Sequence, residues 1–288
     1  MTRAVTTEDE TIAAVAPPGA SAPVEAARLV QAAQRHDADV TAAVMRALDR
    51  KQAMLAFQPV LSAADPSRAA FHEALIRITD DSGRVVPAGE FIGSVEDGET
   101  GRRIDCLALE LGLRELACQP ALRLAVNMSA RSIAYPPWTR VLDAGLAARP
   151  DVGERLILEI TERSAMGMPE LVIAFMEEVH ERGVAFSLDD FGAGQTSLRY
   201  LRDFAFDILK IDGQFVRGIA ECPDNRALTA AMIDIARHFE MLTVAENIET
   251  AEDAAAVTGM GVDCLQGWHC GMPTIRPAWR EEDERQLA

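Results

Sequence analysis

The sequence has 288 residues, enough for one large domain or two ordinary ones, and a formal net charge of −17. This charge argues against binding nucleic acid or anionic lipid through surface charge. No apolar run is long enough to cross a membrane, and the amino terminus lacks the apolar centre of a secretory signal. The five scattered cysteines, without a Cys-x-x-Cys pair, indicate reduced thiols in a cytoplasmic protein rather than disulfides or zinc ligands.

Both ends of the chain are predicted to lie outside the main domain. Residues 1–23 are acidic and then rich in Pro and Ala, which predicts a disordered tail. Residues 24–50 are rich in Ala, contain no Gly or Pro, and space their apolar side chains at helical intervals. They predict a short helical extension of one or two helices, joined near residues 36–39. The charged residues 281–288 predict a frayed carboxyl-terminal tail.

Between residues 51 and 280, short apolar runs alternate with amphipathic helical segments. The runs interpreted as strands are 54–60, 69–78, 122–126, 156–160, 184–188, 208–211 and 242–245. The helical segments include 103–117, 169–182 and 225–239. This alternation predicts a mainly parallel sheet with helices outside it, and the length suits a single (β/α)8 barrel. No linker divides the region, so we expect one domain.

The stretch 185–194 is the centre of this pattern. Its short apolar run stops at two adjacent carboxylates, Asp189 and Asp190, and a Gly-x-Gly turn follows. The run predicts a buried strand, because it is too short and ends too abruptly for a helix. Adjacent carboxylates repel each other, and the stretch contains no Lys or Arg, so a divalent cation is the natural counter-charge. On this dipeptide alone, a solvated acidic turn is the alternative.

Polar side chains stand at or near the ends of most predicted strands. They are Glu73, Asn127, Glu159, Asp189, Asp190, Lys210, Glu246 and Gln266. In a barrel, the carboxyl ends of successive strands meet at one mouth, where such enzymes place their chemistry. Each residue alone could be a strand end that faces water, whereas the whole set predicts a shared site.

The residue types favour a metal site that acts on a phosphoryl group. Carboxylate and amide oxygens suit Mg²⁺ or Mn²⁺, and the dispersed histidines argue against zinc. Five carboxylates exceed what one Mg²⁺ takes from a protein, so we expect two ions about 3.5–4 Å apart, bridged by Asp189. Such ions also allow an anionic substrate in an acidic chain. Lys210 would hold the attacking water or offset negative charge, although by itself it favours a structural salt bridge.

These residues resemble the motifs of the EAL family of cyclic di-GMP phosphodiesterases. In order, the motifs are Glu73-Ala74-Leu75-Ile76-Arg77, Asn127-Met128-Ser129, Glu159-Ile160-Thr161-Glu162, Asp189-Asp190-Phe191-Gly192, Lys210-Ile211-Asp212, Ala245-Glu246 and Gln266-Gly267. They span roughly residues 50–275, and the ordered set is far more specific than its opening motif. The resemblance implies a modified TIM (β/α)8 barrel and hydrolysis of cyclic di-GMP to linear pGpG.

The resemblance also implies metal ligands and residues that act on the substrate. The ligands of one ion would be Glu73, Asn127, Glu159 and Asp189, and those of the second Asp189 and Asp190. Lys210 resembles the lysine that contacts the attacking water, and Glu246 the glutamate that acts on it. The substrate contacts would be Arg77, Leu75, Gln266 and Asp212, and the guanidinium fork of Arg77 suits a phosphate.

Glu162 resembles the anchor of the loop 191–197, which the family links to dimerisation. In this loop, Ala193 and Gln195 replace the frequent Thr and Tyr of the family. Asn247 replaces a usual Gly, which is bearable because Asn tolerates a left-handed backbone. Trp268 replaces a usual Tyr or Phe. None of these changes removes a metal ligand.

The expected partners are cyclic di-GMP, a second copy of the chain through the barrel, and a regulatory partner at residues 24–50. Neither DNA binding nor membrane insertion is expected. Two other functions stay open: a receptor that holds the dinucleotide without cutting it, and a protein-interaction module.

Overall fold

The structure, a computed structural model, describes residues 22–194 and 198–280. The predicted tail at 281–288 and nearly all of the predicted tail at 1–23 therefore lie outside the described residues.

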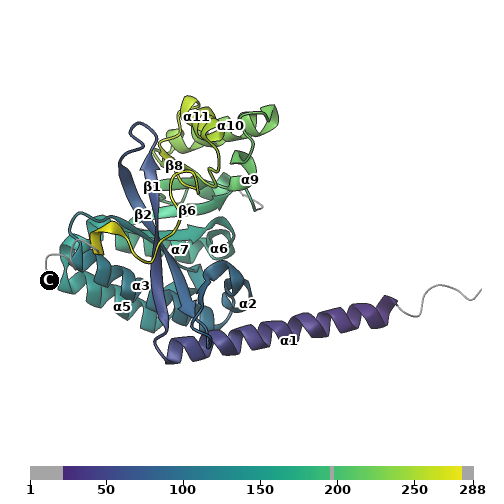
Figure 1. The fold of residues 1–288 in the computed structure, drawn as a ribbon. Coiled ribbons are helices and arrows are strands. Elements are labelled where there is room, and N and C mark those ends of the chain that lie inside the picture. Colours follow the sequence, from purple (N-terminus) through teal and green to yellow (C-terminus); the bar gives the residue numbers. More distant parts are fainter. Residues whose placement is uncertain (1–21, 195–197, 281–288) are drawn as a thin grey trace, which may run out of the picture.

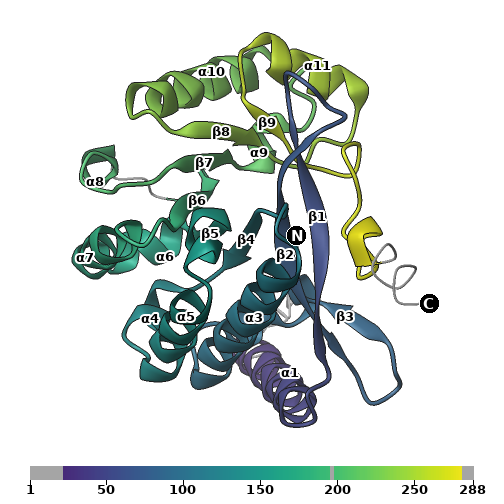
Figure 2. The same cartoon turned by 90° about the vertical axis from the view of Figure 1, so that its left-hand side faces the viewer.

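Eight of the nine strands in the described residues close into a barrel (Figures 1 and 2). The barrel strands are β1 (Ala53–Ser62), β2 (Ala69–Thr79), β4 (Leu124–Asn127), β5 (Leu156–Thr161), β6 (Ala185–Phe191), β7 (Ile208–Ile211), β8 (Leu242–Ala245) and β9 (Cys264–Leu265). From β2 through β9, neighbouring barrel strands are parallel. The remaining strand, β3 (Val85–Pro87), pairs only with β2. The predicted modified (β/α)8 barrel is confirmed.

Strand β1 is the modification, because it runs antiparallel to both of its neighbours, β2 and β9. Only residues 63–68 separate β1 from β2. A parallel pair needs a crossover connection of about a dozen residues or more, so this short link forces a hairpin. In the hairpin register, Gln58 of β1 lies opposite Glu73 of β2.

Helices surround the strands (Figure 2). They are α1 (Ala22–Asp49), α2 (Ile92–Val95), α3 (Glu99–Cys118), α4 (Ala130–Ile133), α5 (Pro136–Ala148), α6 (Glu162–Gly167), α7 (Pro169–His180), α8 (Leu198–Leu201), α9 (Gly213–Val216), α10 (Pro223–His238) and α11 (Ala251–Gly259), with 3₁₀ turns at Ala88–Glu90 and Pro150–Arg155. Pro begins α5, α7 and α10, as suits a position whose N–H has no helical partner.

Helix α1 is continuous through the place where a break was considered possible. Its last part belongs to the core, since Val44, Ala47 and Leu48 are buried and α1 packs on α2, α3 and β2. Its first part extends away from the barrel (Figure 1). The end of the predicted helical extension therefore packs into the domain.

The core has two layers. The larger lies between the strands and the surrounding helices, and Trp138, Leu109 and Phe186 are among its fully buried side chains. The smaller is inside the barrel and joins one side chain from each of seven strands: Val60, Phe71, Ala125, Ile157, Ile208, Val244 and Cys264. We call this smaller cluster the barrel floor.

Gly153 lies where the chain enters β5, and its lack of a side chain is required by packing. A Cβ at this position would overlap the carbonyl oxygen of Arg182. We expect Gly153→Ala to lower the free energy of unfolding by about 1–3 kcal/mol, the usual cost of overpacking. Chemical denaturation would measure it. Gly93→Ala is the matched control, because no atom lies within 4 Å of its added Cβ. Equal stability of the two variants would contradict the close packing at Gly153.

Candidate active site

The polar residues of the site lie directly above the barrel floor. Two positions nearer the mouth from each floor residue, in the strand or directly after its end, stands a polar residue: Gln58, Glu73, Asn127, Glu159, Lys210, Glu246 and Gln266. Side chains two positions apart on a strand share a face. Ser187 and Asp189 repeat the relation on β6. The same alternation that buries the floor therefore brings the predicted site residues together at the mouth.

Lys210 is at the centre of this layer and is almost fully buried. Its Nζ lies 2.8 Å from Glu246 Oε1 and 3.0 Å from Asp189 Oδ1. It also lies 3.2 Å from Glu73 Oε2 and 3.4 Å from Glu159 Oε1. One ammonium therefore faces carboxylates from four different strands or strand ends. The salt bridge that residue type alone favoured for Lys210 is present, at the centre of the predicted site.

Amide side chains hold Glu73 on both of its oxygens. Asn127 Nδ2 donates to Glu73 Oε1 at 2.8 Å, and Gln266 Nε2 donates to Glu73 Oε2 at 2.6 Å. Gln58 Oε1 lies 3.4 Å from Gln266 Nε2, and Gln58 Nε2 donates to the Gly271 carbonyl at 3.1 Å. This chain of amides fixes the rotamer of Glu73.

Asp190 follows Asp189 in a left-handed conformation, with a φ of 56°. The pairing of β6 with β7 is irregular between Leu188 and Phe191, which is where the two carboxylates stand. Oxygens of Asp189, Asp190 and Glu246 all lie within 4.8 Å of one another. The distorted strand end thus turns two consecutive carboxylates toward the same space, which a regular strand would place on opposite faces.

The electrostatics of the layer reflect too few positive charges for its carboxylates. Burial raises the pKa of Glu246 to about 8 and that of Asp190 to about 6, and the neighbouring Asp189 adds to both shifts. Burial also raises the pKa of Glu159 well above its usual value. Burial would raise the pKa of Glu73 too, but Lys210 and the hydrogen bonds from Gln266 and Asn127 lower it below its usual value.

The donor set fits a hard divalent cation. Both oxygens of Glu159 and Asp189 Oδ1 are buried and accept no hydrogen bond within the described residues. Glu159 Oε1 and Asp189 Oδ1 form ion pairs with Lys210, whereas Glu159 Oε2 has no such partner among the described residues. Buried carboxylate oxygens are normally paired, so Glu159 Oε2 is available to a cation. All the candidate ligands are oxygens, as Mg²⁺ and Mn²⁺ prefer. The acidic cluster could therefore hold metal.

Glu162 begins α6 and is buried beneath the loop after Asp190. Its Oε2 accepts a hydrogen bond from the Gly192 backbone N–H at 2.9 Å. A Cβ on Gly194 would lie 3.1 Å from Glu162 Oε1, so the loop passes close over the carboxylate. Ala193 is exposed, and Gln195 lies outside the described residues.

The other departures from the family pattern fit locally. Asn247 has a φ of 53°, so this position does require a left-handed backbone. A Cβ on Gly213 would overlap the Asn247 side chain, which places Asn247 against the start of α9. Trp268 is 68% exposed beside the site.

The remaining predicted residues lie at the rim. Leu75 and Arg77 share the face of β2 that carries Glu73 and follow it toward the mouth. Arg77 is half-buried, and its Nη1 donates to the Ile76 carbonyl at 2.9 Å. Asp212 caps α9, where its Oδ1 accepts from the Gln214 N–H at 2.7 Å. A structural role therefore occupies one oxygen of Asp212.

Two residues of the site were not predicted. Gln58 is a polar residue within a mostly apolar run. This interruption of the run is the sequence signal that could have identified it. Asp105, on α3, accepts hydrogen bonds from the Ser129 N–H at 2.9 Å and the Ser132 hydroxyl at 2.6 Å. It thereby holds the turn that follows Asn127. No motif marks Asp105, since its partners come from a distant part of the chain.

The sequence profile of the EAL domain matches residues 41–273. The chain belongs to the EAL domain family. The cyclic di-GMP phosphodiesterase PdeF of Escherichia coli strain K12 is 29% identical over 234 residues, which cover 80% of this chain and 31% of PdeF. An uncharacterized protein of Mycobacterium tuberculosis is 29% identical over 237 residues, covering 77% of this chain and 76% of that protein. This EAL chain thus spans about a third of the length of PdeF.

Solved structures of EAL domains share the fold. The PaMucR phosphodiesterase, in complex with c-di-GMP, superposes with a TM-score of 0.72 and 28% identity, covering 84% of this chain and 99% of that one. The FimX EAL domain of Pseudomonas aeruginosa superposes with a TM-score of 0.75 at 24% identity, a likeness that concerns the fold alone. Among the described residues of the present EAL domain, no helix is both long and apolar enough to span a bilayer.

The pKa of Asp105 predicts a pH-dependent stability. Burial raises this pKa from 3.8 to about 6, although the hydrogen bonds from Ser132 and Ser129 oppose the shift. The folded state therefore binds the proton more tightly than the unfolded state, so the contribution of Asp105 to stability falls as pH rises between about 4 and 6. Asp105→Asn keeps a carbonyl acceptor without the charge. From pH 4.5 to 7.5, its stability relative to the native protein should rise by about 1–2 kcal/mol.

Urea unfolding at both pH values measures the effect. The exposed Glu177→Gln on α7 serves as control. A constant difference between Asp105→Asn and the native protein would contradict the assigned shift.

Proposed function

We propose that this EAL domain is a metal-dependent phosphodiesterase that hydrolyses cyclic di-GMP to linear pGpG. The observation that carries the proposal is the layer of carboxylates around Lys210 at the mouth of a closed barrel. The family and the names of its relatives indicate the substrate class. The five cysteines, all free thiols, favour the reducing cytoplasm as the location.

In this proposal, two Mg²⁺ or Mn²⁺ ions occupy the mouth. Glu73, Asn127, Glu159 and Asp189 would hold one ion, and Asp189 and Asp190 the other. When bound, the ions supply positive charge that stabilises the phosphoryl oxygens and makes a water more acidic. The buried oxygens of Glu159 and Asp189 that lack hydrogen bonds support this assignment.

Side chains around the ions have separate proposed roles in the reaction. Lys210 Nζ orients the attacking water and offsets the charge that develops on the phosphate. Glu246 Oε1, which lies 2.8 Å from Lys210 Nζ at the mouth, would accept a proton from that water. Glu162 holds the loop after Asp190 through the Gly192 N–H.

Substrate contacts come from the rim. Arg77 would grip a phosphate with its guanidinium fork, and Leu75 would press against a ribose or a base. Gln266 would reach the phosphate from beside Glu73. Asp212 would contact the substrate with the oxygen that does not cap α9.

The direct test is an assay of purified protein with cyclic di-GMP and Mg²⁺ or Mn²⁺, with pGpG separated by chromatography. Glu73→Ala and Asp189→Ala should each abolish product, because each removes a ligand. Glu177→Ala, on the outside of α7, should leave activity unchanged. Absence of pGpG with either metal, in folded native protein, would exclude the proposal. Tight binding of cyclic di-GMP without product would favour a receptor.

We also propose that the protein is a homodimer through its barrel and that a regulatory partner acts on α1. Deleting residues 22–38 leaves Val44, Ala47 and Leu48 of α1 in place, so the shortened chain should keep most of its activity. Deleting residues 22–50 also removes Val44, Ala47 and Leu48 from the core. At about 1.5–3 kcal/mol for each large apolar side chain, this deletion should lower the melting temperature strongly.

Light scattering gives the mass of each form, and calorimetry its melting temperature. Complete loss of activity in the shorter deletion would contradict a purely regulatory role for the first part of α1.

A further inference from the structure

A groove with a volume of about 520 Å³ crosses the outer face of α3. The end of α1, the middle of α3 and the start of α5 supply its walls, and none of its lining residues belongs to the proposed active site. Its floor is apolar, since Leu107 and Leu111 of α3 and Tyr135 before α5 are only half-buried there. We call this cavity the α3 groove.

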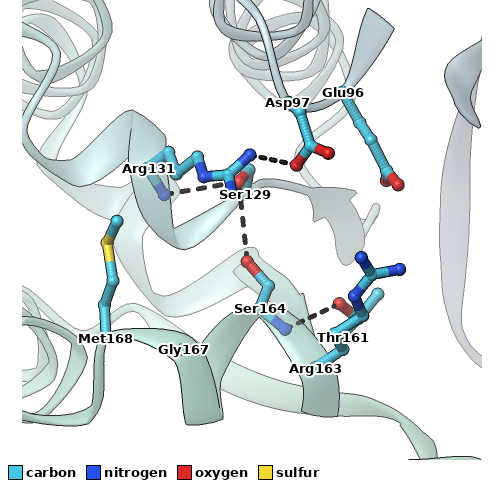
Figure 3. A pocket seen from close by; sticks show the side chains of 9 residues that line it. All are labelled: Glu96, Asp97, Ser129, Arg131, Thr161, Arg163, Ser164, Gly167 and Met168. Atoms are coloured by element: carbon cyan, nitrogen blue, oxygen red, sulfur yellow. Dashed lines mark hydrogen bonds and ion pairs between the residues drawn. The ribbon is translucent and has the colours of Figure 1, made fainter. Parts of the chain in front are cut away.

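The α3 groove differs from a smaller pocket at the rim of the barrel, which has a volume of about 140 Å³ (Figure 3). In that pocket Arg131 pairs with Asp97, and Ser164 Oγ accepts from the Ala130 N–H. Its polar groups are largely used by the protein itself. The α3 groove instead leaves apolar side chains in contact with solvent, as a surface that receives a partner does.

Basic side chains stand around this apolar floor. Arg103 pairs with Asp49 at 2.7 Å, and Arg114 pairs with Glu110 at 2.9 Å. Lys51 follows α1 with a left-handed φ of 56° and is exposed. Within residues 22–194 and 198–280, its side chain has no hydrogen-bond or ion-pair partner. In a chain with a net charge of −17, such a groove suits an acidic segment that also carries an apolar side chain.

The chain itself provides such a segment at the side of the groove. Glu115 Oε1 accepts from Trp279 Nε1 at 2.7 Å, and Glu115 Oε2 pairs with Arg280 Nη2 at 2.7 Å. Glu115 lies one helical turn beyond Leu111, on the same side of α3. Residues 281–288, which lie outside the described residues, therefore continue from a point beside the groove.

The length and composition of residues 281–288 match the groove. Eight residues of extended chain span up to about 27 Å. Helix α3 rises only about 12 Å between Leu107 and Glu115. The segment opens with consecutive acidic residues at 281–284 and has an apolar Leu287 near its other end.

We propose that residues 281–288 dock in the α3 groove, with the acidic residues beside its basic rim and Leu287 on its apolar floor. Leu48 and Lys51 belong to the end of α1 and the turn after it, so the docked segment joins α1 to α3. This role replaces the frayed tail that the charge of the segment alone predicts. It does not depend on the proposed activity.

The first experiment is zero-length crosslinking of the full chain with a carbodiimide, which joins a carboxylate to an amine where the two are in contact. Lys51 and Lys210 are the lysines of the sequence, and Lys210 is buried, so Lys51 reports on the groove. Mass spectrometry should find Lys51 joined to a residue of 281–284. Salt at about 1 M, which shortens the Debye length to about 3 Å, should suppress this product.

Two crosslinking outcomes would overturn the inference. In one, Lys51 is joined only to carboxylates within residues 22–280. In the other, a mixture of ¹⁴N- and ¹⁵N-labelled chains gives products of mixed isotope, which would assign the groove to a second copy of the chain.

The second experiment measures how far the groove is covered, through alkylation of Cys106 by N-ethylmaleimide. Cys106 lines the groove and is half-buried. Burial and the neighbouring Asp105 raise the pKa of its thiol to about 11, so the reaction is slow enough to follow by peptide mass spectrometry. In the test variant, Gln replaces Glu281, Glu282 and Glu284, and Asn replaces Asp283.

The test variant should label Cys106 about 3-fold faster or more than the native chain, because a groove that is covered most of the time reacts mainly when it opens. Arg285→Gln, in the same segment, should not increase the native rate. Cys222, at the start of α10, should label equally in all three proteins. Equal labelling of Cys106 in the native chain and the test variant overturns the inference.

Discussion

The whole site depends on one unfavourable arrangement, the packing of carboxylates from several strands into a small buried space. Only Lys210 offsets them among the charges within contact distance in the described structure. Burial penalises charged groups, so the layer binds protons or cations more readily than surface carboxylates do. The raised pKa values of Glu246, Asp190 and Glu159 express the same deficit. A divalent ion would offset this excess of negative charge more fully than a proton, because it brings two positive charges.

Strand alternation explains why so much of this site is visible in the sequence. Each floor residue, such as Ile157 or Ile208, requires that the residue two positions on also face the axis of the barrel. When that residue is Glu159 or Lys210, a charged side chain faces the inside of the barrel, where packing alone would favour an apolar one. Polar residues at strand ends are therefore informative, and the closed barrel turns their order in sequence into proximity.

Other features depend on contacts that no local pattern records. Strand β1 runs antiparallel because its link to β2 is short. In sequence, however, its apolar run resembles those of the parallel strands. In sequence, Pro136 suggests an interruption of helical structure. It is instead the first residue of α5, a position that suits Pro. Asp105 is one acidic residue among many on helices, and only the fold brings it to Ser129 and Ser132. The predicted roles at the site, including the metal ligands, remain predictions because geometry alone does not assign them.

The segments that follow β4 and β5 are bonded to each other at the rim of the barrel. Ser164 Oγ accepts from the Ala130 N–H, so the start of α4 is bonded to α6. Asp105 holds the same start of α4 from the other side. These bonds hold the turn that follows Asn127, and the same helix α6 begins with Glu162, which accepts from the Gly192 N–H in the loop after Asp190. The turn after β4 and the loop after β6 are therefore both bonded to α6. Because the candidate ligands Asn127 and Asp190 directly precede these two segments, α6 links the backbone on both sides of the site.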